Sequence, residues 1–199
     1  MEDNIGLYKD NEFWIETFTG KRLSPLHLDE KLIDIVDIAH SLSLLCRFVG
    51  HCLTFYSVGE HSILLTEIVA DNMGTSSAIS TEYFNRTCLA ALLDDAAEAY
   101  IGDISRPLKH SPQFKFFREL EEQIKGKIVH KFHLSGADWE LVKKADNIAL
   151  ATEAKWNMAD RGKGWNFTYP ALPLEIHRIA NEDVEPMFLE LFERYGGKY

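Results

Sequence analysis

Positive charge, cysteine and long apolar runs are all scarce in this sequence. Its 199 residues include 21 Lys and Arg against 31 Asp and Glu, which gives a formal net charge of −10. A surface that binds nucleic acid polymers or anionic membranes needs a basic stripe, so this balance argues against both partners and leaves room only for a small basic pocket. No apolar run approaches the roughly 20 residues of a membrane span, and the sequence starts with the acidic stretch Met1-Glu2-Asp3-Asn4. We therefore expect a cytoplasmic protein.

Cysteine usage points to the same compartment. Cys46, Cys52 and Cys88 are odd in number, lack CxxC spacing and lie among apolar residues, which predicts buried, reduced thiols. A hydrophobic content of 46% over this length is enough for one substantial core. We expect a single domain over residues 1–199.

Apolar residues recur at helical spacing along most of the chain, and no convincing period-two segment appears, so the predicted fold class is all-α. Ser57-Val58-Gly59-Glu60 matches a capping box and predicts a helix start just before His61. Residues 161–173 are rich in Gly, Pro and aromatics, which predicts a loop long enough to be a lid or an interface. The expected helices run over 34–50, from Ser57, over about 81–100, from Ser111-Pro112 through Ile128, from Asp138 past Thr152, and over about 182–195.

Carboxylates are concentrated in one otherwise apolar segment, residues 92–103, which contains Asp94, Asp95, Glu98 and Asp103. Aspartate is a poor helix former and is seldom fully buried unless it is paired or bound to metal. The cluster therefore suggests a site for a cation or a substrate. His61 and Asp146, on other predicted helices, are the further polar candidates, although each alone is more often a capped, solvated or salt-bridged residue.

Taken together, these positions resemble the HD-domain phosphohydrolase superfamily, in which one His, a later His-Asp pair and a distant Asp converge on a divalent metal inside a helical bundle. The segments that carry the resemblance to its small 5′-deoxynucleotidase-like branch are 37–43, Cys46-Arg47-Phe48, 55–62 and 94–109. The similarity covers about residues 33–153. It implies a helical bundle of the HD type with its core over 33–153 and an accessory loop and helix over 161–199.

The resemblance also implies a set of metal ligands. His61 is then the first ligand, Asp94 stands in the place of the second His, Asp95 is the paired Asp, and Asp146 is the distal ligand. The family's Leu-Leu-His-Asp reads Leu-Leu-Asp-Asp here. One His and three Asp should weaken binding of Zn²⁺, Co²⁺ or Ni²⁺ and favour Mn²⁺ or Mg²⁺. Two explanations stay open for Asp94: natural variation at this position, or an engineered substitution that disables the metal site.

By the same resemblance, Glu98 and Asp103 orient or protonate groups during phosphate-ester cleavage, and their crowding favours raised pKa values. The alternative is that they only hydrogen-bond the turn before Arg106. Arg47 and Lys109 resemble the family's phosphate contacts, and Arg47 is expected two helical turns after His40 on the same helix face. Phe48, Ile104 and Pro107 are candidate walls for sugar and base, with ordinary core packing as the alternative.

The activity that these resemblances imply is metal-assisted hydrolysis of deoxynucleoside 5′-monophosphates to deoxynucleosides and phosphate, with Co, Mn, Zn or Mg as the cofactor. Three alternatives stay open: a deoxynucleoside triphosphohydrolase, an inactive nucleotide-binding protein that has lost its metal through Asp94, and a helical scaffold without ligands. The triphosphate alternative requires further basic residues such as Lys115, Lys144 or Lys155 at the pocket. The resemblance also suggests a homodimer, to which the 161–173 loop with Trp165 contributes.

Overall fold

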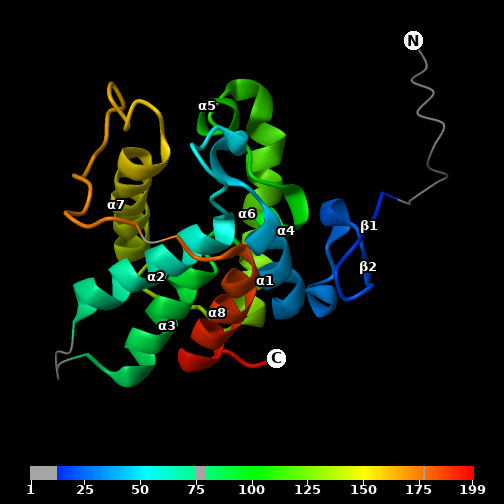
Figure 1. Cartoon of the computed structure of the whole chain (residues 1–199). Coiled ribbons are helices and arrows are strands. Elements are labelled where there is room, and N and C mark those ends of the chain that lie inside the picture. Colours follow the sequence, from blue (N-terminus) through cyan, green and yellow to red (C-terminus); the bar gives the residue numbers. More distant parts are fainter. Residues whose placement is uncertain (1–12, 75–78, 177) are drawn as a thin grey trace, which may run out of the picture.

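The computed structural model describes residues 13–74, 79–176 and 178–199, and its architecture is all-α, as predicted from the sequence (Figure 1). Its α-helices are α1 (Ile35–Leu44), α2 (Val58–Met73), α3 (Thr81–Leu92), α4 (Glu98–Ile101), α5 (Arg106–Lys109), α6 (Lys115–Lys131), α7 (Trp139–Asn157) and α8 (Asn181–Arg194). Short 3-10 segments lie at η1 (Pro25–His27), η2 (Glu30–Leu32), η3 (Arg47–Gly50) and η4 (Pro112–Phe114). Among these described helices, none combines the length and apolar character that a bilayer crossing demands.

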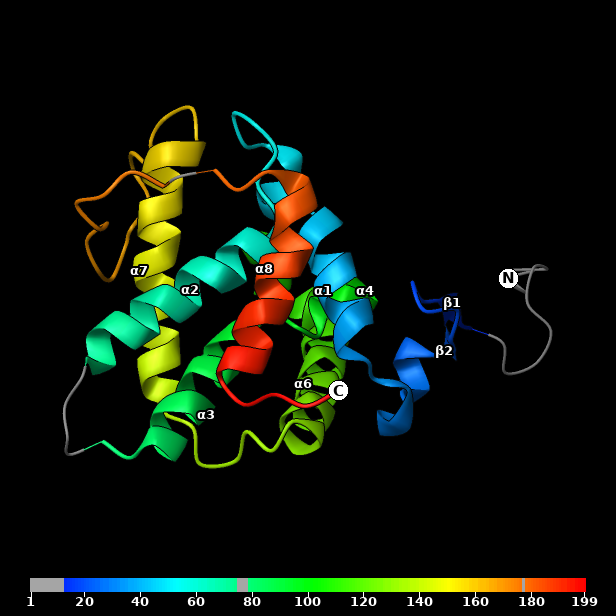
Figure 2. The same ribbon diagram turned by 60° about the horizontal axis from the view of Figure 1, so that its bottom comes forward.

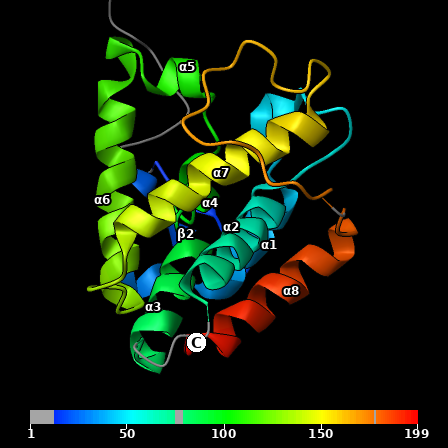
Figure 3. The same cartoon turned by 90° about the vertical axis from the view of Figure 1, so that its left-hand side faces the viewer.

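Helix α2 lies at the centre of the molecule. It packs against α1, α3, α7 and α8, and Figures 2 and 3 show it between α7 on one side and α8 on the other. Phe188 and Phe192 of α8 are completely buried and belong to the same hydrophobic core as Leu65 of α2 and Leu92 of α3. One continuous core therefore connects elements from the first to the last helix of the described chain.

The start of α2 follows the predicted capping box. The Ser57 hydroxyl accepts a hydrogen bond from the Glu60 N–H, and the Glu60 carboxylate accepts one from the Ser57 N–H. Both bonds satisfy backbone donors that a helix start leaves free. Because the cap fixes where the helix begins, it also fixes the direction of His61 in the first turn.

The predicted helix over 34–50 is wrong beyond residue 44. The Arg47 N–H donates to the Tyr56 carbonyl at 2.9 Å, and the Val58 N–H donates to the Leu45 carbonyl at 2.8 Å. These bonds hold residues 45 and 46 in extended backbone against the segment before α2, so α1 cannot continue. The prediction that Arg47 shares a helix face with His40 is therefore wrong, because α1 ends at Leu44 and Arg47 begins η3.

His40 belongs to a different environment from Arg47. Its ring stacks on Phe18 with a centroid distance of 3.6 Å, and its Nδ1 lies 2.9 Å from the Glu185 carboxylate of α8. These contacts fasten the segment before α1 and the helix α8 to the side of α1. A second histidine near Arg47, His51, lines the large cavity described below, whereas His40 does not.

The predicted helix over 81–100 is interrupted where the aspartates lie. Helix α3 ends at Leu92, and residues 93–97 form turns before α4 begins. Here backbone N–H groups bond to the carbonyl three residues earlier, as from Ala96 to Leu93 at 3.2 Å and from Glu98 to Asp95 at 2.9 Å. Aspartate side chains compete with the helical backbone, which favours such a break. As a result, the side chains of Asp94 and Asp95 lie in different surroundings.

Two short elements were not expected from the sequence. Strands β1 (Ile15–Glu16) and β2 (Arg22–Leu23) pair antiparallel at the edge of the molecule, with Ile15 opposite Leu23. Two-residue strands are too short to show a period-two pattern, which explains why they were missed. The helices from Asp138 and near residue 182 were predicted correctly, and residues 161–173 form irregular loop backbone as expected. Cys46, Cys52 and Cys88 are free thiols, although only Cys88 is fully buried.

Candidate metal and substrate site

His61 is the centre of a buried polar cluster built from three elements. It projects from the first turn of α2, where its side chain is 1% exposed. Its Nε2 lies 3.4 Å from Oδ2 of Asp95, in the turn between α3 and α4, and 3.5 Å from Oδ1 of Asp146, on α7. Residues far apart in the sequence therefore face one ring nitrogen.

The other side of the His61 ring is fixed by Glu153, seven residues beyond Asp146 on α7. Glu153 is completely buried, and its Oε1 lies 2.6 Å from His61 Nδ1 and 3.2 Å from the Tyr56 hydroxyl. Arg47 donates to its Oε2 at 3.2 Å. Burial raises the pKa of Glu153, but Arg47 and His61 outweigh it and bring the pKa to about 2. An ionised carboxylate only accepts hydrogen bonds, so His61 Nδ1 is the donor.

With Nδ1 committed to Glu153, His61 Nε2 is left without a hydrogen-bond partner in the described structure, although it is buried. Burial lowers the pKa of His61, yet the facing carboxylates, Glu153 first and then Asp95, raise it overall. The surroundings therefore favour positive charge next to Nε2. A histidine held by a carboxylate through its second nitrogen is also the usual arrangement of a metal-binding histidine.

The donor atoms around Nε2 suit a divalent cation in chemistry and in spacing. Two ligands bound about 2.1 Å from one ion at roughly tetrahedral angles lie about 3.4 Å apart, close to both distances from Nε2. Among the described residues, however, no group of three or more His, Cys, Asp or Glu side chains is arranged as a complete metal site. The oxygen of Asp95 that faces His61 Nε2 is already engaged, because Arg47 Nη1 donates to the same Oδ2 at 3.2 Å. The residues fit a cation, provided that Asp95 and Asp146 turn toward one point.

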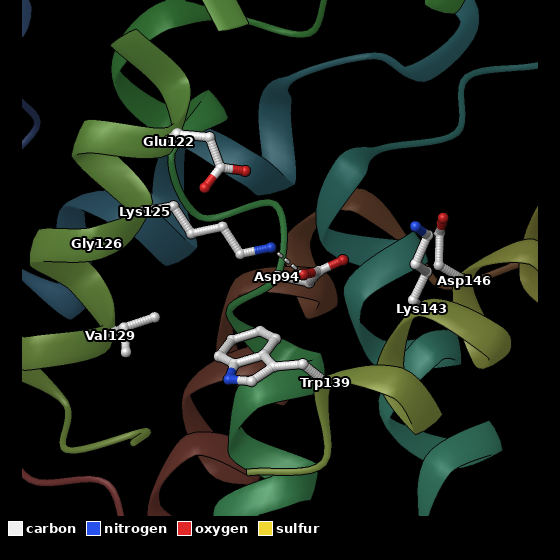
Figure 4. Close-up of a pocket in the computed structure, with 8 residues that line it drawn as sticks. All are labelled: Asp94, Glu122, Lys125, Gly126, Val129, Trp139, Lys143 and Asp146. Atoms are coloured by element: carbon white, nitrogen blue, oxygen red, sulfur yellow. Dashed lines mark hydrogen bonds and ion pairs between the residues drawn. The ribbon is translucent and has the colours of Figure 1, made fainter. Parts of the chain in front are cut away.

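Asp94, the expected fourth ligand, is paired elsewhere. Its Oδ1 forms an ion pair and hydrogen bond with Lys125 of α6, as Figure 4 shows. Burial raises the pKa of Asp94 and the neighbouring Asp95 adds to this, while Lys125 lowers it. The predicted role of Asp94 as a metal ligand stays a prediction, and the sequence did not reveal its pairing with Lys125, 31 residues away.

A cavity of about 1200 Å³ opens next to this cluster. Nearly all the residues predicted for the site line it, and His61 lies behind Asp95 and Asp146. The predicted residues in its lining are Arg47, Phe48, Asp94, Asp95, Glu98, Asp103, Ile104, Pro107, Lys109 and Asp146. Its lining includes residues of η3, of α5 and of the loop after α7. Figures 1 and 3 show these three segments at one end of the molecule.

Glu98 has the chemistry of a proton donor within this cavity. It is 5% exposed, and its Oε2 has no hydrogen-bond partner in the described structure. Burial, followed by the charges of Asp95 and Asp103, raises the pKa of Glu98 well above its ordinary value. Lys109 lies 3.8 Å from the other oxygen, Oε1. These surroundings favour the protonated form of Glu98, whereas Asp103, whose pKa is raised mainly by burial, is more open to solvent.

Phe48 and Trp165 provide aromatic walls, with ring centroids 6.2 Å apart. Phe48 and the following Val49 both have a φ of 55°, a left-handed conformation that is unusual for such side chains and costs about 1–3 kcal/mol each. Backbone strain of this kind is concentrated at functional sites. Arg47, just before them, uses Nη1 and Nη2 on Asp95 and Glu153, so its first role here is to neutralise buried carboxylates.

Sequence reasoning missed several residues of this site. Glu153 had a signal, since it lies two helical turns after Asp146 on the same face of α7. Lys125 had no such signal, because nothing in the sequence distinguishes it from the other charged residues of α6. Its role depends on the position of α6 beside Asp94. Glu121 likewise became visible only through its ion pair with Lys109.

The fold and the site together define an all-α protein with a buried histidine and carboxylate cluster beside a large cavity. No model of a known protein family matches the sequence. The chain belongs to the same family as the uncharacterized protein YfdR of Escherichia coli (strain K12), with which it shares 37% identity over 183 residues, 90% of this chain and 93% of that protein. It is also 32% identical over 149 residues to the uncharacterized protein RCAP_rcc00048 of Rhodobacter capsulatus, over 71% of each chain.

Proposed function

We propose that this protein is a divalent-metal-dependent phosphohydrolase of the HD-domain type that acts on deoxynucleoside 5′-monophosphates. One observation supports it most: His61 Nε2, buried and without a hydrogen-bond partner, faces Asp95 and Asp146 next to a cavity that also contains Glu98 and Lys109. A purely structural cluster would satisfy that nitrogen within the protein.

His61, Asp95 and Asp146 would hold the cation. A bound divalent cation supplies Lewis-acid chemistry for attack of water on a phosphorus centre. Glu153 keeps His61 in the tautomer whose Nε2 is free. Lys109 faces the cavity with a positive charge that suits a phosphate oxygen. Glu98, whose protonated form the surrounding burial and carboxylates favour, would give its proton to the 5′ oxygen of the leaving deoxynucleoside.

The distribution of basic residues favours a monophosphate substrate. Lys115, Lys144 and Lys155, which a triphosphate was expected to need, are absent from the described lining of the cavity. Arg106 and Lys125 do line it, which keeps a deoxynucleoside triphosphohydrolase as the second candidate. The Asp94–Lys125 pair favours a third, a nucleotide-binding protein without turnover, because it withdraws one expected ligand.

A substrate panel separates these candidates. Deoxynucleoside and ribonucleoside mono- and triphosphates are incubated with the protein and Mn²⁺, Co²⁺ or Mg²⁺, and the released phosphate species is identified. We expect inorganic phosphate from deoxynucleoside monophosphates, dependent on added metal and abolished by EDTA. Release of triphosphate would favour the second candidate, and binding without hydrolysis under any metal would favour the third.

Two variants locate the activity. Asp146→Asn should abolish metal-dependent hydrolysis. Glu98→Gln should lower kcat about 100-fold or more while Mn²⁺ binding is retained, because the amide has the size of the acid but no proton to transfer. Unchanged turnover in both variants would place the activity outside this cavity.

A further inference from the structure

A smaller pocket of about 420 Å³ lies beside the main cavity. Asp94, Glu122, Lys125 and Asp146 line both spaces, so they form the wall between them. Figure 4 shows Asp94 in this wall, with Lys125 on one side and Asp146 on the other. Asp94 therefore lies between a resident ammonium group and the aspartate that faces His61 Nε2.

Lys125 is held in place by more than its charge. Its Nζ pairs with Asp94 Oδ1 and lies 4.9 Å from the centre of the Trp139 ring, a cation–π distance. The side chains of Lys125 and Asp94 are 27% and 18% exposed. A partly buried, charge-assisted hydrogen bond of this kind is stronger than an exposed ion pair.

Charge balance explains what this pair does to the site. A ligand set with Asp94 in place of a neutral His contains one more negative charge, and Lys125 supplies one positive charge at the same wall. The ammonium and a cation next to His61 both attract the Asp94 carboxylate. Whatever holds Asp94 on the Lys125 side lowers its availability to the cation.

We infer that Lys125 competes with the metal ion for Asp94 and so sets the metal affinity of the site. Lys125 is in this sense a positioning residue, and it acts through Asp94. With Lys125 present, Asp94 is held in the pocket wall and the cation relies on His61, Asp95 and Asp146. Without it, Asp94 becomes a fourth ligand. This inference rests on the metal site of the proposed function.

Mn²⁺ binding to metal-free protein tests the inference without any assay of activity. Free Mn²⁺ is followed by its electron paramagnetic resonance signal during titration of the unchanged protein and of Lys125→Met. We expect the variant to bind Mn²⁺ at least about tenfold more tightly, because the charge-assisted hydrogen bond no longer holds Asp94. The double variant Asp94→Asn/Lys125→Met should lose that gain.

Lys143→Met is the matched control. Lys143 lines the same small pocket, but within the described residues it forms no ion pair with Asp94, so its removal changes the charge and not the contact. We expect less than about a threefold change. Lys125→Gln, which keeps a polar side chain, repeats the test should Lys125→Met fold poorly, and Lys125→Arg should keep the original affinity.

The outcomes distinguish the inference from the proposed function. If Lys125→Met and Lys125→Gln bind Mn²⁺ with the same affinity as the unchanged protein, the inference is overturned and the metal site stands. An equal gain in Lys143→Met would also overturn it, since general charge would then suffice. If no variant and no unchanged protein binds Mn²⁺, both the inference and the metal site are wrong.

Discussion

At the scale of single residues, Glu153 connects the buried side chains below the cavity. It accepts hydrogen bonds from His61, Tyr56 and Arg47, which come from the segments on either side of the start of α2. Because it orients His61 and neutralises Arg47, it links the stability of the fold to the geometry of the proposed metal site.

We predict that Glu153→Gln weakens Mn²⁺ binding about 10- to 100-fold. It should also lower the free energy of unfolding by about 1–3 kcal/mol, because the change removes one of the two carboxylates that pair with the Arg47 guanidinium. Titration with Mn²⁺ and urea denaturation measure the two effects. Glu140→Gln, on the exposed surface of the same helix, should change the free energy of unfolding by less than about 0.5 kcal/mol. Unchanged Mn²⁺ affinity in Glu153→Gln would show that His61 does not depend on this carboxylate.

At the scale of elements, helices α1 and α8 both approach the first turn of α2 closely. A Cβ on Gly59 would lie 2.7 Å from Cγ1 of Val184 on α8 and 3.3 Å from the backbone of Leu42 on α1. Only a residue without a side chain fits there. The same turn contains His61, so the close packing that holds α1, α2 and α8 together also places the proposed ligand.

We predict that Gly59→Ala destabilises the protein by about 1–3 kcal/mol through overpacking, although alanine is the better helix former. Gly126→Ala on α6 is the matched control, since nothing lies within 4 Å of its added Cβ. That variant should gain up to about 1 kcal/mol from helix propensity. Thermal and urea unfolding measure both. A gain in stability in both variants would contradict the close approach of α8 to α2.

At the scale of the whole molecule, α8 closes the core. Phe188 is completely buried against helices from the first half of the chain, whereas the neighbouring Met187 is 36% exposed. Although the resemblance to HD-domain proteins ends near residue 153, the burial of apolar surface continues to the end of α8. The packing thus extends over most of the described chain.

Phe188→Ala should therefore lower the free energy of unfolding by about 3–5 kcal/mol, a large share of the 5–15 kcal/mol of a typical domain. Met187→Ala on the same helix should cost about 0.5 kcal/mol or less. Urea denaturation followed by circular dichroism and by tryptophan fluorescence measures both. We expect the unfolding curves from the two probes to coincide, because α8 unfolds together with the rest of the core. Equal stabilities of Phe188→Ala and Met187→Ala would contradict the burial of Phe188 in the core.

Features that depend on neighbours along the chain could be predicted from the sequence. Apolar spacing gave the all-α class, the capping box at Ser57 predicted the start of α2 correctly, and the carboxylates of residues 92–103 marked a segment that lines the cavity. The breaks after Leu44 and Leu92 were missed because backbone bonding to residues 56–58 and the turns at the aspartates outweigh local periodicity.

Only the tertiary structure decided which charges meet. Asp94 pairs with Lys125, and Arg47 donates to Glu153 instead of lying on a helix face with His40. The Nε2 atom of His61 faces Asp95 and Asp146. Electrostatic energies between buried groups depend on distance in space and on solvent exposure, and neither quantity is written in the spacing of residues along the chain.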